Sequence, residues 1–242
     1  MSISNNLLFL NDAYKKAAPC KVKRVTKNNE IILDRSLFYP MGGGQPGDSG
    51  KLQISGIECS IRTTMKSDTN EILLIPDSNL NLPDEQAEGV QIIDWQKRYK
   101  YMKTHTALHL LSVAVGLPVT GGQITFEKGR LDFNMPALID DKQELENKLN
   151  DLILANYQVT ESVISEEDLS KQPDLIKTLS VSPPKESGKI RLVRIGSDDV
   201  QVDLQPCGGT HVKETCEIGP IIIGKIEKKG KQNRRFNIFL QS

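Results

Sequence analysis

Long apolar segments are absent from this 242-residue sequence. No apolar run approaches the ~18 residues that a membrane-spanning helix requires. The first residues, MSISNNLLFLND, have neither the basic start nor the small-residue cleavage site of a secretory signal peptide. We therefore expect a cytoplasmic protein that has no membrane partner.

Nucleotide-binding signatures are also missing. The stretch from Tyr39 to Asp48 contains Gly42, Gly43 and Gly44 followed by Gln45, but it matches neither the Walker phosphate loop nor the dinucleotide fingerprint. No nucleotide cofactor is predicted. Three successive glycines permit positive φ and let another backbone or a ligand approach closely. A long flexible hairpin loop is the alternative interpretation.

Cysteine is scarce, and its spacing excludes a disulfide framework. Four cysteines lie scattered along the chain, at Cys20, Cys59, Cys207 and Cys216. Three of them have no neighbour that suggests special chemistry, and we expect ordinary thiols there. Cys207 differs because it lies four residues before a histidine.

Net charge is absent, since Lys and Arg together equal Asp and Glu at 31 each. The charges are nevertheless segregated. Residues 137–175 contain ten acids and three bases, whereas residues 211–242 contain seven bases and three acids. A second basic cluster immediately precedes the first histidine and consists of Lys97, Arg98, Lys100 and Lys103. Each cluster could be a solvated face, but together they favour an anionic ligand.

The first 75 residues contain short strand-like runs separated by turn residues, which predicts a small β-barrel or sandwich. The runs are 21–25, 30–33, 51–61 and 71–75. Residues 76–85 are rich in Pro, Asn and Asp and lack apolar periodicity, as a linker does. We therefore expect one domain over residues 1–90 and a second over residues 91–242.

The second domain is predicted to be α+β with an antiparallel sheet, because helices and strands mix without a regular β-α alternation. Apolar residues recur at helical spacing over 94–115 and over 140–157, where aspartates provide an N-cap. Strand-like runs follow at 129–133, 158–164, 189–195, 200–205, 221–226 and 236–240.

All three histidines of the chain fall into two short motifs. His105 and His109 are four residues apart on a predicted helix, so both imidazoles lie on one face and can share an ion. Cys207 and His211 flank a Gly-Gly pair that can fold tightly around a metal. Soft sulfur combined with imidazole favours zinc. We predict one zinc site formed by these four residues.

The sequence leaves the role of this zinc open. The helix lacks the glutamate general base of the HExxH metalloproteases, with Thr106 and Leu108 between the histidines, so protease chemistry is not supported. Four protein ligands are typical of a structural site, whereas a catalytic site keeps one position open. A displaceable Cys207 would allow the second arrangement.

At the level of motifs, the chain resembles the free-standing AlaX-type proteins, which are related to the editing domain of alanyl-tRNA synthetase. The resemblance extends over nearly the full length and is most specific in 203–211, 217–220 and 225–235, read together with 104–109. The glycine-rich segment Gly42–Gln45 is similar to that of the larger AlaX form, which carries an N-terminal β-barrel. The resemblance implies a barrel followed by a zinc-containing editing domain like the second additional domain of threonyl- and alanyl-tRNA synthetases.

The function implied by the resemblance is hydrolysis of mischarged alanine tRNA, principally seryl-tRNA with glycyl-tRNA as a second substrate. Selection of serine over alanine requires a hydrogen bond to the serine hydroxyl. Position in the sequence makes Thr106, Gln123 and Thr125 candidates for the catalytic pocket. We also expect the glycine-rich loop to pack near this pocket. Basic side chains would meet tRNA phosphates, and the candidates are Lys97, Arg98, Lys100, Lys103, Lys228, Lys229, Lys231, Arg234 and Arg235.

Three other functions compete with this one. A non-catalytic RNA-binding module with structural zinc would unfold when the metal is removed. A metal-dependent hydrolase of small esters would be indifferent to tRNA and to salt. A complete aminoacyl-tRNA ligase is rejected, because no segment resembles an adenylation domain.

Overall fold

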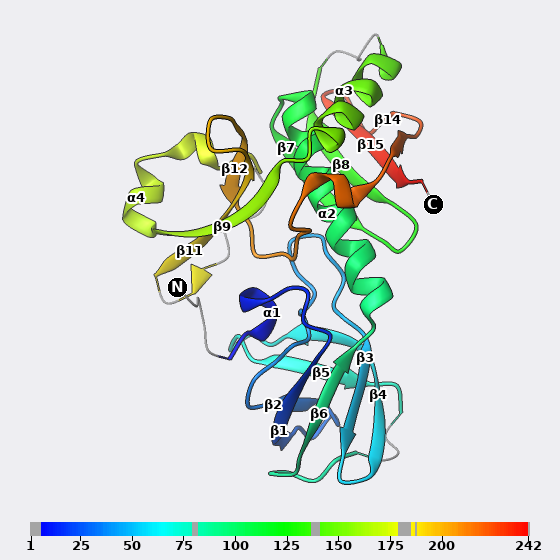
Figure 1. Cartoon of the computed structure of the whole chain (residues 1–242), viewed down its shortest axis with the longest axis vertical. Helices are drawn as coiled ribbons and strands as arrows, with labels where there is room; N and C mark the ends of the chain where they lie inside the picture. Colours follow the sequence, from blue (N-terminus) through cyan, green and yellow to red (C-terminus); the bar gives the residue numbers. More distant parts are fainter. Residues whose placement is uncertain (1–5, 79–81, 137–140, 179–184, 187, 242) are drawn as a thin grey trace. The chain divides into compact units, whose positions relative to one another are not determined.

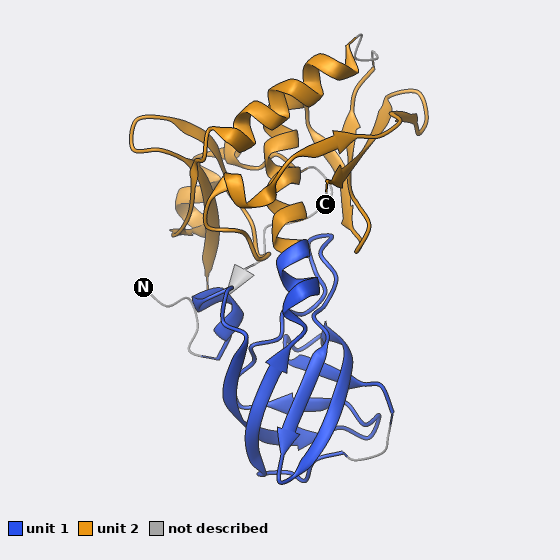
Figure 2. Ribbon diagram, turned by 45° about the vertical axis from the view of Figure 1, so that its right-hand side comes forward, with its two compact units in different colours: residues 1–100 blue, residues 101–242 orange. Residues whose placement is uncertain are grey.

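The protein's computed structural model describes residues 6–78, 82–136, 141–178, 185–186 and 188–241. The chain divides into two compact units, residues 1–100 and 101–242, coloured separately in Figure 2. Residue 90, the expected boundary, lies inside a strand, and residues 79–81 of the expected linker lie outside the described residues. The division falls within helix α2 (Trp95–Val115), so its first turns belong to unit 1 and the rest to unit 2.

Unit 1 is a closed antiparallel barrel, which confirms the predicted barrel (Figure 1). A short helix α1 (Leu8–Asn11) precedes it. The strands are β1 (Ala17–Val25), β2 (Ile31–Leu33), β3 (Gly50–Ile54), β4 (Ile57–Lys66), β5 (Ile72–Pro76) and β6 (Glu88–Ile93), paired in the order β1-β2-β5-β4-β3-β6. Alternate residues of β1, namely Ala18, Cys20 and Val22, are buried in the barrel core. This period-two pattern is what one buried strand face produces.

Two expectations for unit 1 were wrong in detail. The single strand predicted over 51–61 is a hairpin, in which Ile54 pairs with Ile57. The turn residues Ser55 and Gly56 have φ of 51° and 78°, as a two-residue hairpin turn requires at both central positions. Strand β6 was not predicted at all, although it pairs with both β1 and β3 and closes the barrel.

Unit 2 contains two antiparallel sheets and confirms the predicted α+β class. One sheet has the order β13-β15-β8-β7, with β14 paired to β15. Its strands are β7 (Val119–Ile124), β8 (Gly129–Asn134), β13 (Ile221–Ile223), β14 (Glu227–Lys228) and β15 (Asn233–Leu240). The other has the order β10-β11-β12, with β9 paired to β11. It comprises β9 (Gln158–Ser165), β10 (Lys185–Glu186), β11 (Lys189–Gly196) and β12 (Gln201–Pro206).

Short helical elements complete unit 2. They are α3 (Lys142–Leu154), α4 (Glu166–Ser170) and the 3-10 turns η1 (Pro173–Leu175) and η2 (Thr215–Ile218). The predicted aspartate cap is present, because the Asp141 side chain accepts the Glu144 amide at 2.9 Å. Leu145, Leu149 and Ile153 form the buried face of α3. Residue 140, where this helix was expected to begin, lies outside the described residues.

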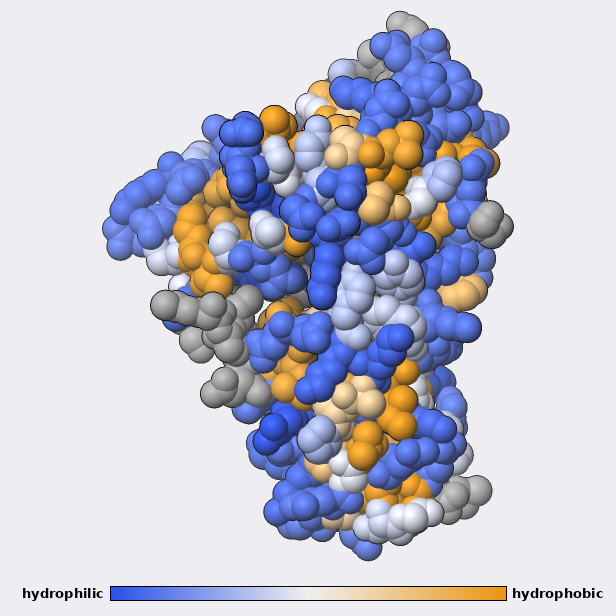
Figure 3. Space-filling view, in the orientation of Figure 1, coloured by the Kyte–Doolittle hydropathy of each residue, from blue (hydrophilic) through white to orange (hydrophobic). Residues whose placement is uncertain are grey.

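The surface carries no continuous apolar band on the face shown in Figure 3, where hydrophobic residues form scattered patches. Among the helices of the described ranges, none is long and apolar enough to cross a membrane.

A buried ion pair fixes the start of α2 within unit 1. The Arg98 guanidinium is fully buried and binds both carboxylate oxygens of Asp48, which is 2% exposed. It also donates to the backbone carbonyls of Ala13 and Leu37 at 3.0 and 2.8 Å. The backbone N–H of Tyr39 donates to the Asp48 carboxylate at 2.6 Å. One charge pair therefore ties together the helix start, the N-terminal segment and both ends of the glycine-rich loop.

The glycine-rich loop is a hydrogen-bonded turn between these ends. Gly42 and Gln45 exchange backbone hydrogen bonds of 3.1 and 2.9 Å, and the Tyr39 hydroxyl donates to the Gly42 carbonyl. Gly43 and Gly44 have φ of 56° and 81°, which favours glycine at both positions. The side chain of Gln45 is fully buried. The structure thus replaces the flexible-loop alternative with an ordered turn.

We predict that Asp48→Asn destabilises unit 1 by about 3–5 kcal/mol, because it leaves the buried Arg98 charge without a counter-ion. Urea unfolding of the full chain, followed by fluorescence of Trp95, its single tryptophan, measures this loss, since Trp95 packs on the barrel core. The matched control is Glu58→Gln, which breaks the exposed Lys51–Glu58 pair and should leave the midpoint nearly unchanged. Equal midpoints for the two variants would contradict a stabilising role for the buried pair.

Candidate metal centre

Helix α2 contributes two imidazoles to one buried cluster. His105 and His109 lie one turn apart on the helix, with ring centroids 5.3 Å apart. Both residues are 7% exposed. The four-residue spacing places the rings on the same helix face, as predicted.

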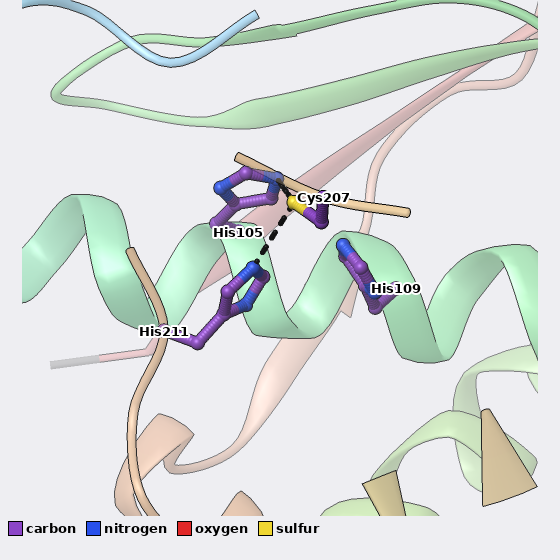
Figure 4. Close-up of side chains that lie close together, drawn as sticks. All are labelled: His105, His109, Cys207 and His211. Carbon is purple, nitrogen blue, oxygen red and sulfur yellow. Dashed lines mark hydrogen bonds between the residues drawn. The ribbon is translucent and has the colours of Figure 1, made fainter. Parts of the chain in front are cut away.

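The loop that follows β12 contributes the other two side chains (Figure 4). The Cys207 Sγ atom lies 3.5 Å from His105 Nε2 and 3.3 Å from His211 Nε2. The potential ligand atoms of all four residues lie within 4.8 Å of one another. The structure therefore brings together the four residues that the sequence predicted as metal ligands.

A carboxylate orients His109 from behind. Its Nδ1 donates to Asp203 Oδ2 at 2.8 Å, so Nε2 is the nitrogen that remains for the cluster. Asp203 is held in turn by Lys177 and by the Gln205 amide, which donates to Oδ2 at 2.8 Å. Burial would lower the pKa of His109, but the Asp203 hydrogen bond and the Cys207 thiol outweigh it and raise this pKa to about 9.

The hydrogen bonds of Asp203 lower the pKa of its carboxyl group. Burial would raise that pKa, yet the contacts with His109 and Lys177 prevail and bring it to about 2. Asp203 is therefore ionised at neutral pH and can only accept hydrogen bonds. A buried carboxylate that accepts from the outer nitrogen of a histidine is the usual arrangement behind a metal-bound imidazole.

A threonine orients His211 in the same way. The Thr106 hydroxyl donates to the Met102 carbonyl at 3.0 Å and lies 3.1 Å from His211 Nδ1. Because its only proton is used on Met102, Thr106 accepts from Nδ1, which leaves the lone pair on Nε2. Burial, followed by the nearby His105, lowers the pKa of His211 to about 3. His211 is therefore a neutral imidazole with its free lone pair directed at the cluster.

Cys207 has the least buried residue surface of the four, although its position in the cluster is buried like the others. The residue is half-buried, whereas the three histidines are buried. Burial would raise the pKa of its thiol, but His105 and His211 outweigh this effect and hold the pKa well below its ordinary value. The Gly209 amide also donates to Sγ at 3.4 Å. These contacts favour a thiolate, the form that binds metals.

Two of the donor separations match those of a tetrahedral ion. Zinc bonds of about 2.0–2.3 Å place neighbouring ligand atoms about 3.3–3.8 Å apart. The two separations from Cys207 Sγ, 3.5 and 3.3 Å, fall in this range, and all four ligand atoms lie within 4.8 Å of one another. Three imidazole nitrogens and one thiolate can hold a metal ion here, and the two orienting partners, Asp203 and Thr106, are already in place.

The three predicted pocket residues lie in different environments. Thr106 is fully buried behind His211. Gln123 lies exposed on β7, where its side-chain oxygen accepts from Arg130 Nε at 3.1 Å. Thr125 belongs to the turn after β7 and bonds to the backbone of Lys128. Of the three, the structure brings Thr106 into contact with the metal cluster.

The basic residues predicted to meet tRNA divide between surface and interior. Lys228, Lys229 and Lys231 are exposed around β14 and the turn that follows it. Arg234 is 4% exposed and donates to backbone carbonyls that include Pro136, while Arg235 forms an ion pair with Asp132.

The cluster that precedes His105 is also only partly at the surface. Lys97 is exposed and paired with Asp94, and Lys100 and Lys103 are half-buried. Arg98 is buried in the pair with Asp48 described above. Its guanidinium has no surface to present to a phosphate.

Sequence reasoning assigned no role to Asp203, Gln205 or Lys177. A signal was present for the first two, because residues two apart on a strand point to the same face. Asp203 and Gln205 are polar, alternate along β12 and precede Cys207 directly. Lys177 follows η1 and carried no comparable signal.

Comparison with known proteins places this centre in a family. The threonyl and alanyl tRNA synthetase second additional domain matches residues 190–237, which include β12, Cys207 and His211. The alanyl-tRNA editing protein AlaX-M of Methanosarcina acetivorans is 34% identical over 239 residues, covering 95% of this chain and 96% of the relative. AlaX-M of Saccharolobus solfataricus is 34% identical over 233 residues, covering 94% and 95%.

A longer relative shares only this region. Alanine–tRNA ligase of Pyrobaculum arsenaticum is 33% identical over 231 residues, which cover 91% of this chain but 25% of the ligase. The chain and the AlaX-M relatives match over almost their full lengths, and the matched region holds the barrel and the His/Cys cluster. The chain therefore belongs to the AlaX-M family of alanyl-tRNA editing proteins.

Proposed function

We propose that the cluster binds one zinc ion through His105, His109, Cys207 and His211. The donor set supports this, since imidazole and thiolate select zinc over magnesium or calcium. The single observation that carries the proposal is the convergence of the four donor atoms within 4.8 Å. When bound, zinc supplies a Lewis acid that polarises an ester carbonyl.

We further propose that the protein hydrolyses the ester between a wrong amino acid, serine or glycine, and alanine tRNA. It would act in trans on tRNA released by the ligase, in the cytoplasm. The names of the relatives, which match over almost their full lengths, support an editing role. An aminoacyl ester is far more reactive than a peptide, so positioning and electrostatics suffice without a protein general base.

The residues of the chain have separate tasks in this scheme. Asp203 and Thr106 hold His109 and His211 by their Nδ1 atoms, so that both Nε2 atoms face the cluster. Half-buried Cys207 and Gly208 mark the edge from which the end of a tRNA can approach. The exposed lysines at Lys228–Lys231 supply positive charge for phosphates.

We predict that the purified protein contains one zinc per chain and that Cys207→Ala weakens zinc binding by more than about 100-fold, since orienting residues alone are worth roughly 10- to 100-fold. Metal analysis and competition with a chromophoric chelator measure both quantities. Cys216→Ala is the matched control, because Cys216 is exposed and outside the cluster. Equal zinc affinity in the two variants would refute the ligand assignment.

We predict that the wild type deacylates seryl- and glycyl-tRNA of the alanine type and spares alanyl-tRNA. Cys207→Ala should lower the rate about 100-fold or more, because it removes electrostatic stabilisation from the reaction. Cys216→Ala should keep the wild-type rate. Single-turnover assays with each charged tRNA measure the rates. Equal rates on all three substrates, or no activity on any, would exclude the editing proposal.

Metal removal separates this proposal from the alternative of a non-catalytic RNA-binding module. A chelated protein that keeps its circular dichroism spectrum but loses deacylation supports a catalytic site. A chelated protein that unfolds, with no deacylation before chelation, supports the structural module.

We predict that Lys228→Gln weakens tRNA binding and lowers the salt dependence of the binding constant. The slope of log K against log salt should fall by roughly 0.7–0.9 for each phosphate that the protein no longer neutralises. The matched control is Lys171→Gln, because Lys171 is also exposed but stands beside the acids Glu167 and Asp168. Filter binding at several salt concentrations measures the slopes. Identical slopes for both variants would remove Lys228 from the tRNA surface.

A further inference from the structure

A buried arginine outside the ligand set contacts the metal-binding loop. Arg191, on β11, is 5% exposed. One of its terminal nitrogens, Nη1, donates to the carbonyls of Cys207 and Gly209, at 2.8 Å each. The backbone of the same residue accepts the Cys207 amide at 3.1 Å. Arg191 therefore meets the loop at three points within three residues of chain.

A glutamate on the neighbouring strand fixes the guanidinium. Glu161, on β9, binds Arg191 Nε at 3.0 Å and also binds Nη2. The Glu161 carboxylate thus binds the edge of the guanidinium formed by Nε and Nη2, and Nη1 donates to the two loop carbonyls. Because β9 pairs with β11 along its length, the position of the guanidinium is set by sheet register. The loop is consequently anchored to the sheet by way of a charge pair.

This anchoring has a direct effect on the loop's shape. Two carbonyls, two residues apart, are drawn toward a single nitrogen, which bends the segment between Cys207 and Gly209. The bend lies between Cys207 and His211, whose Sγ and Nε2 atoms are 3.3 Å apart.

We propose that Arg191, held by Glu161, is a positioning residue that preorganises the Cys207–His211 half of the metal centre. It touches neither the metal ligand atoms nor any reacting group, and it acts by way of the loop carbonyls. The proposal rests on the proposed zinc binding. Residue spacing alone does not reveal this role, because Arg191 lies outside the ligand motifs.

The chemistry requires arginine at this position. A guanidinium presents donors in a planar fork, so it can bind a carboxylate on one edge while another nitrogen serves two carbonyls. The ammonium of lysine keeps the charge but has no fixed fork. Arg191→Lys therefore removes the geometry and retains the charge, which makes it a sharper test than removal of the side chain.

The experiment measures zinc affinity of the full-length protein by chelator competition and follows the thiolate-to-cobalt absorption band after cobalt substitution. We expect Arg191→Lys to weaken zinc binding roughly 10- to 100-fold and to shift the cobalt band, as the loss of an orienting residue does. Glu161→Gln should give a smaller loss. The matched control is Arg194→Lys on the same strand, whose guanidinium donates to the Ser197 carbonyl instead of the metal loop, and it should keep wild-type affinity.

Each outcome decides the question. Weaker zinc binding and an altered cobalt band in a variant with the wild-type circular dichroism spectrum support the positioning role. A lower melting temperature with unchanged zinc affinity and cobalt spectrum overturns it and makes Arg191 a purely structural residue. If Arg191→Lys does not fold, Glu161→Gln answers the same question. The Glu161 side chain is 37% exposed, so water can solvate the amide that replaces its carboxylate. Failure of the wild type to bind zinc at all would refute the metal centre itself, independently of Arg191.

Discussion

The organisation of unit 2 depends on bringing four polar side chains together in a buried place. His105, His109 and His211 are 5–7% exposed, and an unpaired polar group at such a site costs free energy. The protein meets this cost with a partner behind each of two rings, Asp203 for His109 and Thr106 for His211. Each partner binds the Nδ1 atom of its ring, so the Nε2 atom of the ring faces the cluster. The outer ring nitrogens of His109 and His211 therefore have hydrogen-bond partners. The potential ligand atoms on the inner side of the cluster face one another and can hold a cation.

Features that depend on residues near one another in the sequence could be predicted, and features that depend on distant residues could not. The helix over Trp95–Val115 and the ligand pairs were predictable, because helical period and a four-residue spacing are local properties. The hairpin at Ser55–Gly56 was missed because a single strand over residues 51–61 overlooks the Ser-Gly turn signal inside it. The role of Asp203 depends on contact with His109 across 94 residues, which a single sequence does not encode in any local pattern.

The roles of two charged residues, Arg98 and Arg191, also depend on partners that are distant in the sequence. Arg98 belongs to a basic run in the sequence, but its partner Asp48 lies 50 residues away and the pair is buried. Arg191 carried no motif at all, since its effect on the metal loop arises from the pairing of β9, β11 and β12. Single-sequence reasoning thus singled out the four clustered residues and Thr106, but it missed Asp203 and Arg191, because their contacts depend on strand register.

The separation of the two halves of the metal centre along the chain has a consequence for biosynthesis. His105 and Cys207 are 102 residues apart, and strands β9, β11 and β12 lie between them. At roughly 5–20 residues per second, a ribosome needs about 5–20 s to add this stretch. The helical histidine pair is therefore made well before its partners, and a metal ion can be enclosed by all four ligands only after the second sheet is synthesised. An ion held by all four residues would therefore be captured only after His211 has been synthesised.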